Sequence, residues 1–118
     1  MPWLRKRDRV RQVFRWLQAE FPTRYDPVRL RIEQMPKYAR DSEAMAFCEQ
    51  PGLVRLSAKL RRGDMVYCLL HEWAHLRVER INARQDRTHA DHHSPKFWLE
   101  YGRLEAAFWA NQKEISRY

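Results

Sequence analysis

Five consecutive residues, His71-Glu72-Trp73-Ala74-His75, combine the side chains of zinc-dependent hydrolysis at a workable spacing. On an α-helix, residues four apart lie one above the other, so His71 and His75 can direct two imidazoles at one metal ion. Glu72 lies about 100° around the helix from His71, where its carboxylate can accept a proton from a water molecule beside that ion. The motif therefore predicts a Zn²⁺ site with two histidine ligands and Glu72 as general base.

A catalytic zinc site usually has three protein ligands and one open position, so a third ligand is needed. The extended pattern HExxHxxGxxH is excluded, because Val78 and Ile81 stand where it requires glycine and histidine. A glutamate of the last predicted helix, Glu100 or Glu105, is one alternative. Cys68, three residues before His71, is a further candidate, as a soft accessory ligand.

A second source of ligands is a histidine cluster just before the last predicted helix. His89, His92 and His93 fall within five residues of a chain that has five histidines in all. We expect at least one of them to bind the metal.

Periodicity and turn residues predict an α+β fold in which helices position this motif. Alternating apolar residues indicate strands, Pro22 ends the first helix, and Ser94-Pro95 is an N-cap pair for the last one. The expected elements are a helix over Leu4 to Phe21, strands over Val28 to Met35, Ala44 to Glu49 and Leu53 to Ala58, a metal-site helix from an Asp64 N-cap to about Ile81, and a helix over Pro95 to Lys113. The three strands are expected to form a small, mostly antiparallel sheet.

The two later helices are each expected to bury one face. On the metal-site helix the apolar side is Val66, Leu69, Leu70, Trp73 and Leu76, which leaves the HExxH residues on a polar edge. On the last helix the inward residues are Phe97, Trp98, Tyr101, Leu104, Phe108 and Trp109. Gly102 within that pattern predicts close approach of another element.

Length and composition predict one domain, residues 1–118, with a core large enough to fold without disulfides. We expect a cytoplasmic protein without a membrane segment, whose Cys48 and Cys68 are reduced. The net charge is +8, and 18 of the 23 basic residues are arginine. Because arginine binds phosphate bidentately, DNA is a candidate partner, with solvated basic faces as the other explanation.

Two segments together resemble the SprT-like (Spartan-type) zinc metallopeptidases and the related WLM-type hydrolases. They are Leu70 to Leu76, which contains HEWAH, and Asp91-His92-His93-Ser94-Pro95-Lys96-Phe97-Trp98. These families carry HExxH on one helix and then His-Gly or His-Ser, two residues and Phe at the start of the next. The resemblance covers about residues 53 to 100.

The resemblance implies a minimal zincin-like metallopeptidase domain with a Zn²⁺ cofactor and a protein or peptide substrate. It makes His71, His75 and His93 the zinc ligands and Glu72 the base, with Phe97 packed beneath the site. His92 and Asp91 then become candidates for orienting a ligand or touching the substrate. Ser94 stands where many relatives have glycine, and no cysteine-rich ribbon follows, so action on nucleic-acid-associated proteins rests only on the basic surface.

The chemistry requires a donor for the developing oxyanion, for which Tyr101 and Arg103 are candidates. Two other readings stay open. A small basic nucleic-acid-binding protein could hold a structural zinc, with Cys68 or Asp91 as fourth ligand and Glu72 idle. An inactive zincin-fold scaffold is the second.

Overall fold

The computed structural model describes residues 4–34, 46–49, 52–78 and 94–118, and it confirms an α+β fold. The described elements occur along the chain as follows: α1 Lys6–Glu20, β1 Arg29–Glu33, β2 Ala46–Glu49, β3 Leu53–Ser57, α3 Arg62–Val78, α4 Pro95–Ala110 and α5 Gln112–Ile115. Each predicted helix and strand therefore has a counterpart. The first helix is shorter at both ends, and β1 and β3 are shorter than predicted. The predicted strand residues Met35, Ala44 and Met45 and the predicted helix residues 79–81 lie outside the described ranges.

The three strands form a mixed sheet in the order β1-β3-β2. β2 and β3 pair antiparallel, as predicted, with Ala46 opposite Leu56. β1 and β3 pair parallel, with Arg29 opposite Leu53, so the prediction of a mostly antiparallel sheet is wrong for this pair. β3 lies in the middle, with Val54 and Leu56 fully enclosed.

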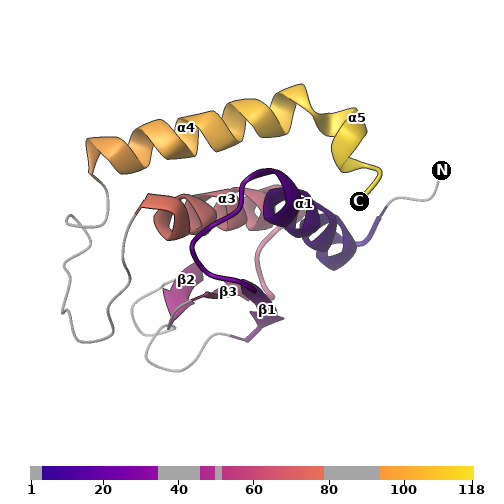
Figure 1. The fold of residues 1–118 in the computed structure, drawn as a ribbon. Helices are drawn as coiled ribbons and strands as arrows, with labels where there is room; N and C mark the ends of the chain where they lie inside the picture. Colours follow the sequence, from indigo (N-terminus) through magenta and orange to yellow (C-terminus); the bar gives the residue numbers. More distant parts are fainter. Residues whose placement is uncertain (1–3, 35–45, 50–51, 79–93) are drawn as a thin grey trace.

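The helices stack in layers above the sheet, as Figure 1 shows. α4 and α5 form the top layer, α1 and α3 the middle one, and the sheet lies beneath. α3 packs on α1, α4, β2 and β3. Because α3 has neighbours on several sides, most of its second half is buried, and the predicted apolar side is enclosed, with Leu69, Leu70 and Trp73 each 0% exposed.

α1 is attached to α3 by its apolar face. Val10, Val13 and Leu17 are buried, and Trp16 is 1% exposed. Trp73 of α3 donates from its indole nitrogen to the Phe21 carbonyl at 2.8 Å. These contacts fix the helix that carries the HExxH motif against the N-terminal helix.

The last helix differs from the prediction in its end and in its exposed face. Asn111 leaves the helical conformation and donates from its side chain to the Ala107 carbonyl, so α4 ends at Ala110 and the short α5 follows. Phe97, Leu104 and Phe108 face inward as predicted, but Trp98 is 53% and Trp109 59% exposed. Since α4 packs mainly on one neighbour, α3, only a narrow stripe is buried.

The predicted close approach at Gly102 is also wrong. Gly102 is exposed, and no atom lies within 4 Å of the position that a Cβ would take. It lies on the solvent side of α4, where a glycine brings no neighbouring element closer.

Gly52, which enters β3, is the glycine that the fold requires. Its φ is +83°, and an added Cβ would lie 3.2 Å from the Pro27 carbonyl oxygen and from Tyr25 Cβ. Its own carbonyl accepts from the Arg29 amide at 2.6 Å and so begins the β1–β3 pairing. We expect Gly52→Ala to lower the free energy of unfolding by about 1 to 3 kcal/mol. Denaturant titration checks this, with Gly63→Ala, where no neighbour lies within 4 Å, as control.

No helix in the described ranges combines the length and apolar character needed to cross a membrane.

Candidate metal centre

The HExxH residues lie on α3, the helix that packs against α1, α4, β2 and β3. The helix begins at Arg62, and the Met65 amide donates to the Arg61 carbonyl, so the prediction of Asp64 as N-cap is wrong. Asp64 lies instead in the first turn, where its charge favours the positive end of the helix dipole. Glu72 and His75 are each only 7% exposed, and His71 is half-buried. The predicted polar edge is therefore largely enclosed.

The rings of His71 and His75 lie at a separation that is compatible with one shared metal ion. The ring centroids of His71 and His75 are 4.9 Å apart. Two imidazoles bound at about 2 Å to one zinc ion with near-tetrahedral angles have centroids about 5 Å apart. The donor set and its spacing therefore fit Zn²⁺, with His71 and His75 as two of the residues that would hold it.

Phe97 of α4 packs against both imidazoles, as the resemblance implied. Its ring lies nearly parallel to that of His75 at a centroid distance of 4.3 Å and meets His71 at 5.0 Å. The predicted N-cap positions it, since Ser94 Oγ accepts from the Phe97 amide at 3.2 Å. Phe97 is 0% exposed, so it limits rotation of both histidines and keeps water from one side of them.

Two further aromatic residues of α4 lie beside His71. The Tyr101 ring lies 6.0 Å from the His71 ring, and the Trp98 ring lies 6.5 Å away and nearly parallel to it. Burial raises the pKa of the Tyr101 hydroxyl, and the charges of Glu105, Tyr67 and Cys68 raise it further. Tyr101 therefore remains a protonated hydrogen-bond donor at neutral pH.

Cys68 lies one turn before the motif in a half-buried position. Burial raises the pKa of its thiol to about 11, with further contributions from the negative charges of Glu72 and Asp64. A thiol with this pKa is protonated at neutral pH. In the metal-free protein Cys68 is therefore a protonated, half-buried thiol.

Slow alkylation of Cys68 is the expected consequence. In a Cys48→Ser background we expect iodoacetamide to modify the native protein at pH 8 about 100-fold more slowly than the unfolded chain, because the thiolate fraction falls tenfold per unit of raised pKa. The rate should keep rising as the pH approaches 11. Mass spectrometry of quenched samples measures it, and a rate that levels off below pH 9 contradicts the buried thiol.

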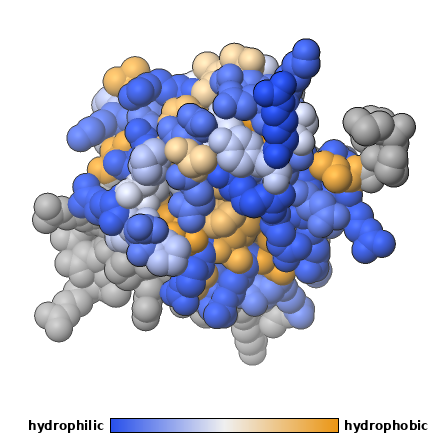
Figure 2. Space-filling view, turned by 45° about the vertical axis from the view of Figure 1, so that its right-hand side comes forward, coloured by the Kyte–Doolittle hydropathy of each residue, from blue (hydrophilic) through white to orange (hydrophobic). Residues whose placement is uncertain are grey.

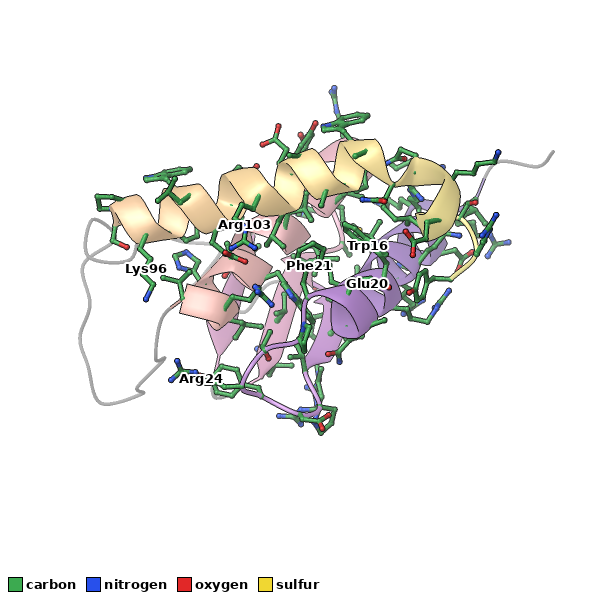
Figure 3. The ribbon with its side chains drawn as sticks, turned by 45° about the horizontal axis from the view of Figure 1, so that its top comes forward. Trp16, Glu20, Phe21, Arg24, Lys96 and Arg103 are labelled. Atoms are coloured by element: carbon green, nitrogen blue, oxygen red, sulfur yellow. The ribbon has the colours of Figure 1, made fainter. Side chains whose placement is uncertain are left out.

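Glu100 and Arg103 belong to an ion-pair network on another side of α4. Arg77 Nε lies 2.5 Å from Glu100 Oε1, and Arg103 Nη1 lies 3.3 Å from Glu100 Oε2. Arg77 also donates to the Pro22 carbonyl at 2.6 Å, which joins α3, α4 and the end of α1. Figure 3 shows Arg103 between α4 and α3. Sequence patterns gave no signal for Arg77, whose partner lies 23 residues away.

In this network two predicted site residues, Glu100 and Arg103, have structural roles. Because the Glu100 carboxylate already pairs with Arg77 and Arg103, Glu100 is disfavoured as the third zinc ligand. Arg103 follows Tyr101 by two residues, about 200° around the helix, so of the two proposed oxyanion donors Tyr101 is the one beside His71. Glu105 lies near enough to Tyr101 to influence its pKa.

The other predicted ligands lie outside the described residues: His89, Asp91, His92 and His93. Within the described ranges, no three histidine, cysteine, aspartate or glutamate side chains are grouped as a metal site.

The sequence matches no family model, and comparison with curated proteins and with solved structures finds no similar protein.

Proposed function

We propose that the protein is a zinc-dependent metallopeptidase of the SprT-like type, with a zincin-like fold. The observation that carries the proposal is the pair of imidazoles 4.9 Å apart on a buried helix, with a buried carboxylate between them in sequence. α3 packs against two helices and two strands, and this packing preorganises the three groups. A chance occurrence of the five-residue pattern would not require such a setting. His71 and His75 would hold the zinc, together with His93.

The chain's residues supply the remaining parts of peptide hydrolysis. Zinc, when bound, lowers the pKa of water toward 7 and polarises a carbonyl oxygen. Glu72 accepts the proton of the attacking water and returns it to the leaving amine. Tyr101, whose hydroxyl stays protonated, donates a hydrogen bond to the developing oxyanion. The exposed ring of Trp98 offers an apolar surface for a substrate side chain beside His71.

An extended substrate can pair with the edge of the sheet nearest the metal helix. Among the described strands, β1 and β2 are the edges, and β2 packs against α3. A peptide added to β2 would gain backbone hydrogen bonds there, with limited dependence on its sequence. β2 is therefore the proposed substrate strand.

The basic surface suggests a class of target. Arg5, Arg7, Arg11 and Arg15 of the α1 region are all exposed. This surface supports the proposal that the peptidase acts on proteins bound to nucleic acid. A DNA affinity that does not change with salt concentration would rule out phosphate contacts by these arginines.

Metal removal tests the activity. We expect the purified protein to hold about one zinc ion, to cleave an unfolded substrate such as casein, to lose cleavage on treatment with 1,10-phenanthroline, and to recover it on addition of zinc. Elemental analysis and gel-based cleavage assays measure both quantities. A zinc-loaded, folded protein that cleaves no unfolded or DNA-bound protein would contradict the proposal.

A further inference from the structure

A groove between α1 and β1 lies apart from the metal centre. Its cavity has a volume of about 370 Å³ and is lined by Arg11, Phe14, Arg15, Val28, Arg29 and Leu30. Apolar side chains form the floor and three guanidinium groups form the rim. Figure 2 shows apolar atoms at the bottom of a hollow ringed by hydrophilic residues.

The groove is built on fixed elements. Phe14 meets the buried Trp73 ring edge-on at a centroid distance of 5.7 Å, which anchors the floor to the core. Gln18 of α1 donates from its amide to the Val28 carbonyl at 3.0 Å and so ties the two walls together. A ligand in this groove would therefore meet a preformed surface.

The charged side chains that line the groove are all positive within the described ranges. None of the described lining residues is acidic. Arg15 donates to the Tyr118 carbonyl at 2.8 Å, whereas in the described part of the chain no carboxylate pairs with Arg11 or Arg29. Three neighbouring like charges favour an anionic ligand.

The backbone of β1 adds a second kind of recognition. The Arg29 amide donates to the Gly52 carbonyl, and the Ala58 amide donates to the Glu33 carbonyl. In a parallel ladder this register turns the N–H and C=O groups of Arg29, Arg31 and Glu33 toward β3. The corresponding groups of Leu30 and Ile32 then point to the other edge, where no described strand pairs with them.

We propose that the groove binds an acidic, extended segment of another protein, which adds to β1 as a further strand. Its backbone pairs with Leu30 and Ile32, its apolar side chains rest on the floor at Phe14, and its carboxylates meet Arg11 and Arg29. A bare phosphate would use the charges but neither the apolar floor nor the free backbone groups. Because β1 and β2 are opposite edges of the sheet, this site is separate from the proposed substrate strand and does not depend on peptidase activity.

A fluorescent peptide that alternates glutamate and valine, capped at both ends, tests the proposal by anisotropy on the full chain. We expect saturable binding, and about tenfold or greater loss in the double variant Arg11→Glu/Arg29→Glu. Arg7→Glu/Arg24→Glu makes the same charge change at exposed positions outside the groove and should cost much less. Thermal melts establish that both variants fold.

Peptides methylated on backbone nitrogen distinguish strand pairing from charge attraction alone. Because only alternate residues of an added strand direct their N–H groups at β1, methylating one alternate set should abolish binding and methylating the other should not. Equal loss in the two double variants, or equal tolerance of both methylated sets, would overturn the proposal. So would a thymidine oligonucleotide that binds more tightly than the peptide and displaces it, which would assign the groove to nucleic acid.

Discussion

Replacing Glu72 by glutamine is expected to lower peptide cleavage about 10²- to 10⁴-fold, the usual contribution of a positioned general base, while zinc content stays unchanged. Glutamine matches glutamate in shape and keeps hydrogen-bonding capacity in the 7% exposed position, but it cannot accept the water's proton. Cleavage rates and elemental analysis of the same preparation measure the two effects. This combination is specific to a catalytic site, since a structural zinc site or an inactive scaffold predicts no dependence on the Glu72 carboxylate.

The Glu72→Gln variant can also be tested by a measurement that needs no substrate. The negative charge of Glu72 is one cause of the raised pKa of the Cys68 thiol, so its removal should lower that pKa and speed alkylation of Cys68 at a given pH. An unchanged alkylation rate would mean that the two side chains are not neighbours.

The matched control for the cleavage and zinc measurements is Glu105→Gln, which removes one negative charge near Tyr101 and should retain most activity and all zinc. Tyr101→Phe should also retain zinc but lose activity, as expected for an oxyanion donor.

Unchanged cleavage by Glu72→Gln would refute the peptidase mechanism, whatever the zinc content. Loss of both zinc and activity would instead assign Glu72 to holding the site together.

Hydrophobic periodicity predicted where the helices lie along the sequence, because each helix buries residues at helical spacing. Val10, Val13 and Leu17 follow that rule on α1, and Leu69 and Trp73 follow it on α3. The parallel direction of β1 against β3 has no such signal, since alternation along a strand is the same whichever way its neighbour runs. Strand direction depends on the path of the chain between Glu33 and Ala46, which local patterns do not specify.

Burial on the helices was predicted less well than their position. Periodicity assigns a face to each apolar residue, but the number of neighbours decides how much of that face is covered. α3 has neighbours on several sides, so Glu72 and His75 are enclosed as well. α4 packs chiefly on α3, so Trp98 and Trp109 remain exposed although both are strongly apolar. The packing of Phe97 against His71 and His75 was expected from the sequence and is confirmed, whereas the burial of Glu72 and His75 depends on contacts distant in sequence.

Removal of His93 should weaken zinc binding more than removal of His92 or His89. The sequence joins His93 directly to Ser94, the N-cap that sets the start of α4 and the position of Phe97 against both helical histidines. A ligand attached at this point needs no long connection to reach the His71–His75 pair. His93→Ala should therefore reduce zinc affinity by more than the about 10- to 100-fold that loss of a residue supporting a ligand costs, whereas His92→Ala should stay within that range and His89→Ala should change little.

Competition with a chromophoric chelator measures the three affinities, and the absorption spectrum of Co²⁺-loaded protein reports whether a ligand has changed. His75→Ala serves as the reference for loss of a proposed helical ligand, with the unfolding temperature of each metal-free variant showing that the fold persists. Because zinc bound to the native state stabilises it by about 2.7 kcal/mol at 100 times its dissociation constant, wild type and His92→Ala should gain thermal stability on addition of zinc. His93→Ala and His75→Ala should gain little. If His92→Ala rather than His93→Ala lost zinc affinity, the third ligand would be His92. If Glu105→Gln lost zinc affinity, the third ligand would be Glu105 on α4.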